Sequence, residues 1–208
     1  MRSDVLIAAR PGRGPHIECR GGIAVHRTAI DTVHLVSTAA TPLGGDVISV
    51  RVVVESGARL TVRSVAATLV LPGASSAQSR SAWRLEVSGT LDLDPEPTVV
   101  AATSQHLAQT RLVLTAGAAV RIRERVQIGR TGEREGFWSG SMHGDIDGAP
   151  LIRHRVELGH GILTDDAIAS PRACVSELHY PRGDPTVAGV ALSLAGGGCL
   201  TTWQGDRL

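Results

Sequence analysis

Apolar residues alternate with polar ones over several short stretches of this chain, and this pattern predicts β-strands. Residues 47–54 and 60–71 are long enough to form strands that are buried on at least one face. Pro72 and Gly73 are expected to end the second of them. Shorter stretches of the same kind predict further strands at residues 33–36, 151–158, 187–194 and 199–203. The chain is therefore expected to be mostly β.

A weak repeat runs through the central part of the chain. Gly57, Gly89 and Gly117 each follow an apolar stretch and precede alternating apolar positions. Such a recurrence predicts stacked β-hairpins or β-helix-like layered sheets. The spacing of the three glycines is not constant, so a regular solenoid is not expected, and three ordinary hairpins are the alternative.

Little helix is expected. Thr164 can cap a helix whose first turn carries Asp165 and Asp166, and Pro171 would end that helix early. We therefore expect one or two short helices beside the strands.

Two segments lack a clear strand pattern. Residues 129–150 are polar and rich in glycine, and they are expected to form a loop region. Residues 1–22 have the composition of a loose leader that ends in a short strand near residues 17–19. No linker clearly divides the chain, so residues 1–208 are expected to form a single domain.

Composition limits the kinds of partner. Hydrophobic residues make up 42% of the chain but aromatic residues only 2%, so alanine and β-branched side chains must fill the core. The formal net charge of +1 does not suggest the basic stripe that a nucleic-acid surface needs. No stretch approaches the roughly 20 apolar residues of a membrane span, and no secretory signal is visible. We therefore expect no nucleic-acid and no membrane partner.

The cysteines indicate a reducing compartment. Cys19, Cys174 and Cys199 are odd in number and form no close pair, which argues against a disulfide framework. A cytoplasmic location is therefore expected. A soft-metal site built from Cys174, Cys199 and His179 is one interpretation, and small buried side chains are the simpler one.

Motifs of the common enzyme classes are missing from the sequence. There is no phosphate-binding loop, no dinucleotide fingerprint, no zinc-protease motif and no nucleophile elbow. The eight histidines are scattered and form no local ligand pair. The chain is therefore not expected to be an enzyme.

Two acidic residues stand in glycine-rich turns. Asp46 follows Gly44 and Gly45, and Glu133 follows Gly129 and Gly132. One interpretation is structural, with a turn hydrogen bond for Asp46 and an ion pair with Arg130 for Glu133. The other is a hydrated passage for a divalent cation, because carboxylate oxygens can hold such an ion without trapping it.

The order of these motifs resembles one family. Gly44-Gly45-Asp46 opens a strand, Gly57-Ala58 precedes the next strand, and Ala66-Ala67-Thr68 follows it. Further on come Gly117-Ala118 and a strand that leads to Gly129-Arg130. This ordered series, over about residues 33–160, resembles the UreD class of urease accessory proteins, called UreH in some organisms.

The resemblance implies a scaffold without catalytic turnover. It implies docking on the nickel-free urease apoenzyme together with the UreF accessory protein and the GTPase UreG. It also implies that no cofactor is tightly bound and that nickel is in transit, with Asp46 and Glu133 as candidates for lining the passage. Gly44 and Gly45 are expected to be structural turn residues. The alternative is a β-rich small-molecule binding or hydrolytic protein, for which the sequence shows no convergent nucleophile and base.

Overall fold

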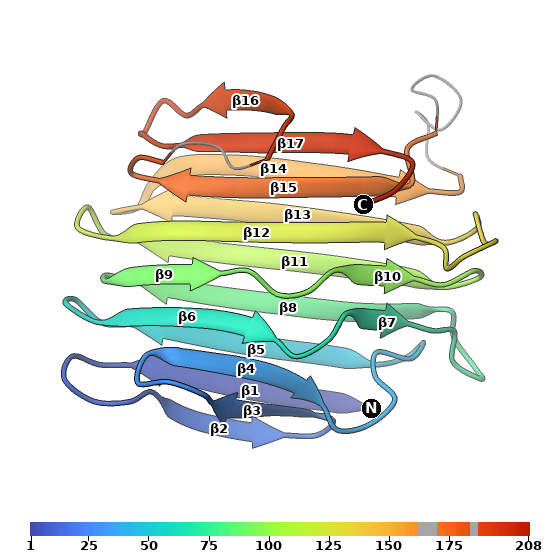
Figure 1. Ribbon diagram of the computed structural model, residues 1–208, viewed down its shortest axis with the longest axis horizontal. Helices are drawn as coiled ribbons and strands as arrows, with labels where there is room; N and C mark the ends of the chain where they lie inside the picture. The colour runs from blue at the N-terminus through green and yellow to red at the C-terminus, as the bar shows by residue number, and fades with distance from the viewer. Residues whose placement is uncertain (162–169, 184–186) are drawn as a thin grey trace.

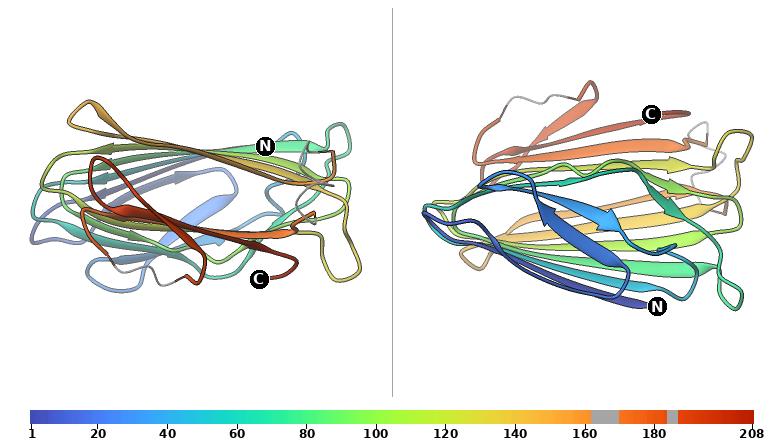
Figure 2. Two further views of the ribbon diagram at one scale, coloured as in Figure 1. Left: turned by 90° about the horizontal axis from the view of Figure 1, so that it is seen from above. Right: turned by 60° about the horizontal axis from the view of Figure 1, so that its bottom comes forward.

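Two β-sheets pack face to face and run along the long axis of the molecule (Figures 1 and 2). The computed structural model describes residues 1–161, 170–183 and 187–208. Within these residues every regular element is a strand, which confirms the layered β architecture. The short helix expected at residues 164–169 lies outside the described residues. Among the described residues, no helix long and apolar enough to cross a membrane is found.

Sheet A has seven strands. Its five central strands, β1, β5, β8, β11 and β13, run parallel to one another, and β2 and β14 close its two edges in antiparallel pairing. In spatial order the strands are β14 (Ala149–Gly159), β13 (Phe137–Ile146), β11 (Gln105–Leu114), β8 (Gln78–Val87), β5 (Val47–Val54), β1 (Arg2–Ala9) and β2 (His16–Arg20).

Sheet B has ten strands, and its central part is also parallel. The main order is β16 (Val190–Ser193), β17 (Cys199–Gly205), β15 (Ala173–Tyr180), β12 (Ala119–Ile128), β9 (Thr90–Leu93), β6 (Arg59–Ser64), β4 (Thr32–Ser37) and β3 (Ile23–Arg27). Two short strands extend the stack, β10 (Thr98–Val100) beside β12 and β7 (Thr68–Val70) beside β10.

The weak sequence repeat corresponds to the turns between the two sheets. Gly57 lies between β5 and β6, Gly89 between β8 and β9, and Gly117 between β11 and β12. Each turn carries the chain from a strand of sheet A to the next strand of sheet B, so successive passes stack in parallel like the coils of a β-solenoid. The antiparallel strands at both ends interrupt that regularity.

The core forms where inward-facing positions of neighbouring strands share a register. Val52, Leu85 and Leu112 are adjacent on β5, β8 and β11, and all three are fully buried. Leu60 and Leu91 pair in the same way on sheet B and belong to the same large apolar cluster. A second, smaller apolar cluster contains Trp138, Val126, Leu158 and Cys174.

Three expectations for individual segments are wrong. Residues 2–9 do not form a loose leader, because Val5 and Ile7 alternate inward as part of β1. Residues 137–146 form β13 rather than a loop, and Gly140 is needed there because a Cβ would lie 2.0 Å from the Trp138 ring. Residues 60–71 are divided between β6 and β7.

Candidate functional site

A chamber of about 260 Å³ lies between the two sheets. Members of both apolar clusters line it, so it marks the boundary between them. Polar residues also line it, among them Thr41, Ser81, His106, Thr110 and Glu124, and Glu96, Arg123 and Arg125 contribute to the lining as well. Because a cavity with a few convergent polar groups is the usual form of a ligand site, this chamber is the candidate functional site.

Glu124 reaches the chamber because of the alternation along β12. Its neighbours on the same face, Ile122 and Val126, are both buried, whereas Arg123 and Arg125 pair with acids on the outer face of sheet B. The Glu124 side chain makes no hydrogen bond or ion pair with any residue that the structure describes. It is therefore a carboxyl group held inside the fold without a fixed partner.

The electrostatic state of Glu124 follows from its burial. Loss of solvent disfavours the charged carboxylate and raises the pKa of Glu124 to about 7. At neutral pH the group is therefore divided between its neutral and its charged form. It can accept a proton or a cation without breaking an existing contact.

Three more polar side chains lie next to Glu124 where the two sheets meet. Ser176 is its register partner on β15. The Ser176 hydroxyl lies 3.7 Å from Cys174 Sγ and 3.5 Å from Nε2 of His154 on β14. Burial raises the pKa of the Cys174 thiol to about 11 and lowers that of His154. The thiol is therefore protonated at neutral pH and the imidazole is uncharged.

His106 is fixed on the opposite wall, in sheet A. The Ser79 hydroxyl lies 2.8 Å from its Nδ1 and the Ser81 hydroxyl 2.9 Å from its Nε2. Burial lowers the pKa of His106 to about 4, so this ring is neutral at physiological pH. Because both serines come from β8, adjacent to β11, the sheet itself orients the imidazole.

This arrangement does not support hydrolysis. Ser79 and Ser81 contact His106 at distances suited to a nucleophile and its base. However, both ring nitrogens are occupied by hydroxyl groups, and a pKa near 4 makes the imidazole a poor base at neutral pH. No carboxylate in the described part of the chain bonds this ring.

A preassembled metal centre is also missing from the described ranges. They contain no group of three or more His, Cys, Asp or Glu side chains that could hold a metal ion. The chamber instead offers separate donors, such as the Glu124 carboxyl group and the Met142 thioether. Isolated oxygen and sulfur donors can bind a divalent cation weakly and release it again.

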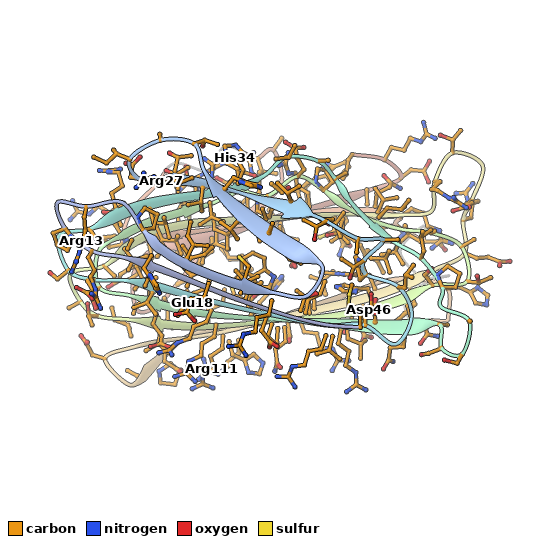
Figure 3. The ribbon with its side chains drawn as sticks, turned by 90° about the horizontal axis from the view of Figure 1, so that it is seen from below. Arg13, Glu18, Arg27, His34, Asp46 and Arg111 are labelled. Atoms are coloured by element: carbon orange, nitrogen blue, oxygen red, sulfur yellow. The ribbon has the colours of Figure 1, made fainter. Side chains whose placement is uncertain are left out.

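Asp46 is held in a closed set of contacts. Its carboxylate accepts hydrogen bonds of 2.9 Å from the Thr41 hydroxyl and from the Leu43 N–H, and it pairs with the Met1 amino group. Burial raises the pKa of Asp46, but these contacts outweigh it and leave the pKa below its ordinary value. Asp46 lies toward one end of the molecule (Figure 3). Its link to the chamber runs through Thr41.

The two glycines before Asp46 have different roles in the turn. Gly45 has a φ of +92°, in the left-handed region that favours glycine. Gly44 packs against backbone, and a Cβ there would lie 1.7 Å from the Ser76 carbonyl oxygen and 2.5 Å from the Gly73 nitrogen. The turn is closed by a hydrogen bond of 2.9 Å from the Asp46 N–H to the Leu43 carbonyl group.

Glu133 lies in a turn far from the chamber wall. Its carboxylate accepts hydrogen bonds from the Arg130 N–H at 3.0 Å and the Ala102 N–H at 2.9 Å, and it pairs with the Arg130 guanidinium group. These contacts, led by the Arg130 side chain, lower the pKa of Glu133 to about 2. The carboxylate lines a separate groove near Asp206.

The structure therefore does not bring the two predicted passage acids together. Asp46 and Glu133 share no contact within the described residues, and their role in metal transit stays a prediction. Sequence reasoning missed Glu124 as a chamber residue. The available signal was its position on β12. The other residues on the inward face of this strand, Val120, Ile122, Val126 and Ile128, are all apolar and buried.

Comparison with known proteins gives a consistent result. Residues 23–193 match the family described as UreD urease accessory protein. "Urease accessory protein UreD 1" of Saccharopolyspora erythraea is 38% identical over 97% of this chain and 80% of its own length. "Urease accessory protein UreD" of Frankia casuarinae is 36% identical over 89% of this chain, and that of Streptomyces coelicolor 37% identical over 77%. The chain spans 64% of the Frankia casuarinae protein and 68% of the Streptomyces coelicolor protein.

Replacing Glu124 with Gln should remove one component of the pH dependence of stability. The native pKa near 7 exceeds the ordinary value of 4.5, so the unfolded chain loses this proton first as pH rises. Wild-type stability is therefore lowered progressively between those two values, and Glu124→Gln should be more stable by roughly 1–3 kcal/mol above pH 7. Urea unfolding at several pH values measures the difference.

The matched control is Glu135→Gln, because Glu135 is exposed and lies outside the chamber. It should follow the wild-type pH profile. Parallel profiles for wild type and Glu124→Gln would show that this carboxyl group is not held in a low-dielectric site.

Substitutions at the two turn glycines should differ in cost. Gly44→Ala places a methyl group against backbone atoms, so we expect a loss of about 3 kcal/mol in unfolding free energy. In Gly45→Ala the added methyl group would lie in open space. The loss in unfolding free energy should therefore come only from the positive φ and be about 1 kcal/mol. Thermal and urea unfolding of the two variants would test this order, and equal losses would contradict it.

Proposed function

The chain belongs to the UreD family of urease accessory proteins, and from this we propose that it is a scaffold that supports insertion of nickel into the urease active site. In this proposal it binds the nickel-free urease apoenzyme and the accessory proteins UreF and UreG. The observation that carries the proposal is the family match over residues 23–193.

The architecture is suited to such a role. Its long strands form a rigid body with two broad outer faces on which other proteins can dock. The sequence has no phosphate-binding loop, so the nucleotide hydrolysis that we assign to this assembly belongs to the partner UreG. No resident cofactor is required, and nickel is the cargo.

We further propose that nickel in transit uses the chamber between the sheets. Glu124 is suited to a transient contact, because its carboxyl group has no competing partner among the described residues. Asp46 and Glu133 remain part of this proposal as acids outside the chamber, on segments of the route that lead to or from it. Their hydrogen bonds support a structural contribution as well, so substitution must separate the two roles.

Deleting the gene in a urease-positive host should leave urease protein present but poor in nickel. The expected result is an almost complete loss of urease activity at unchanged urease abundance, because metal loading and not synthesis is affected. Metal analysis of purified urease and quantitative immunoblotting measure the two quantities. Normal nickel content in the deletion strain would refute the proposed function.

Complementation with neutral isosteres tests the route. Glu124→Gln should fold and still assemble with the partners, yet lower urease activation at limiting nickel by about tenfold, because a charged ligand becomes a weak neutral one. Asp46→Asn and Glu133→Gln are expected to lower activation in the same assay. Glu135→Gln is the control and should activate like wild type.

These outcomes distinguish the roles of each acid. Normal activation by one variant removes that residue from the route. Failure of a variant to co-purify with its partners assigns the residue to folding or docking instead.

A further inference from the structure

Four arginines form a row across the outer face of sheet A. Arg51 on β5 is the register partner of Arg84 on β8, and Arg84 is the register partner of Arg111 on β11. Arg111 is opposite His143 on β13, and His143 is opposite Arg153 on β14. We call the row of Arg51, Arg84, Arg111 and Arg153 the arginine ladder.

Such a row is electrostatically unfavourable in the isolated protein. Adjacent strands are only about 4.8 Å apart, and like charges that face one another across strands destabilise a sheet. The ladder side chains are between 45% and 62% exposed, so all four point into solvent. Figure 3 shows Arg111 on the side of its sheet that faces away from the other sheet.

Among the residues that the structure describes, two carboxylates pair with the ladder arginines. Glu86 pairs with Arg51 at 3.0 Å and with Arg84 at 2.6 Å. Asp145 pairs with Arg111 at 3.0 Å and also with Arg153. Two acids therefore serve four guanidinium groups, and the row keeps an excess of positive charge.

The contacts also leave hydrogen-bond donors unused. A guanidinium group carries five N–H donors, and within the described part of the chain Arg84 donates to a side chain only through its Nε and Arg111 only through its Nη2. The remaining edge of each fork is available to a planar acceptor. Carboxylates fit that edge with two parallel hydrogen bonds.

The outer face of sheet B shows that this excess is not general in the fold. There Arg63, Arg121, Arg123 and Arg125 are only 18% to 28% exposed. Asp92, Asp94 and the fully buried Glu177 pair with them in a connected network. These four arginines of sheet B therefore share three carboxylates and are largely shielded from solvent, whereas the four ladder arginines share two and are more exposed.

A groove runs beside the ladder. It has a volume of about 660 Å³, and Arg51, Arg84 and Arg111 all line it. Arg2, Arg20, Asp4 and Glu18 line it as well, so five arginines face two carboxylates and the lining keeps a positive excess. Ser49 and Ala82, two small residues that are register partners, also line it. The short side chains leave room for a segment of another chain beside the guanidinium groups.

We propose that the arginine ladder and its groove form a docking surface for an acidic segment of a protein partner. The ladder spans several adjacent strands, which corresponds to about 15–20 Å at the spacing of a sheet. A short row of carboxylates on the partner fills the open guanidinium edges and offsets the repulsion along the row. This surface is distinct from the chamber and from any role in nickel transit.

The same features favour a protein over a nucleic acid. Glu86 and Asp145 stand between the arginines, so a phosphate backbone, which is charged at every unit, would bring charge against both carboxylates. A peptide can place its carboxylates at the guanidinium groups and uncharged residues between them. Trp83 is the one aromatic residue in the groove lining, and it packs against the core cluster, so the groove offers no row of rings for stacking on successive bases.

The test uses the double substitution Arg84→Gln and Arg111→Gln. Glu86 keeps Arg51 and Asp145 keeps Arg153, so neither carboxylate is left unpaired. The matched control removes two exposed arginines elsewhere, Arg59→Gln and Arg80→Gln. Arg80 lies on the same strand as Arg84, and among the described residues its guanidinium group donates hydrogen bonds only to the Gln78 side chain.

The probe is a fluorescent peptide of about 12 residues in which Glu and Ala alternate, long enough to cross the ladder when extended. A peptide with Gln in place of Glu and a single-stranded DNA of similar length serve as comparisons. Fluorescence anisotropy is measured with the full chain at low and at moderate salt. Thermal melting of each variant is recorded in parallel.

The Glu peptide should bind to the wild-type chain, and added salt should lower its affinity because the contact is electrostatic. The ladder variant should bind about tenfold more weakly at an equal or higher melting temperature, because the substitutions remove charges that repel one another. The control variant should match wild type in affinity. Equal affinity of wild type and ladder variant, or of the Glu and Gln peptides, would overturn the proposal. Tighter binding of the DNA would assign the surface to a nucleic acid instead.

If the double variant does not melt cooperatively, the single variants Arg84→Gln and Arg111→Gln take its place. Each should weaken binding of the Glu peptide by about threefold, as expected for one of two similar charge contacts. Wild-type affinity in both single variants would also overturn the proposal.

Discussion

In-register parallel pairing between successive passes of the chain is the constraint on which this structure depends. Each pass adds one strand to sheet A and one to sheet B, so residues at the same position of each strand become neighbours. Apolar positions such as Val52, Leu85 and Leu112 then form continuous rows in the core. Burial of these rows supplies the main favourable energy of folding, and the backbone hydrogen bonds of both sheets fix their register.

The same pairing also aligns residues that are not apolar. Where Ser79 and His106 share a register, the core is interrupted, and the serine hydroxyl groups satisfy the buried ring. Next to this interruption the two sheets enclose a chamber, into which β12 places the Glu124 carboxyl group. The carboxyl group is therefore a local departure from the apolar pattern, and such departures are typical of functional sites.

The register of the strands also decides which charged residues become neighbours on the outer face of each sheet, and the two sheets differ in the result. On sheet B it brings acids and arginines together, and the result is a closed network around Glu177. On sheet A it brings arginines beside arginines, and two acids neutralise only part of the row. Both arrangements result from in-register pairing of the strands. Only the outer face of sheet A keeps an excess of positive charge that can bind another molecule.

The sequence by itself determined the strand-rich class, several strand positions, the glycine turns between the sheets and the family resemblance, because these depend on local alternation, turn residues and motif order. It did not reveal that residues 2–9 join sheet A, or that the glycine-rich residues 137–146 form a strand in it. Tertiary structure decided these, because β1 joins sheet A through its parallel pairing with β5 and β13 through its parallel pairing with β11. It likewise placed Glu124 and His106 around one space and the four arginines in one row, since register between strands is not encoded within any single strand.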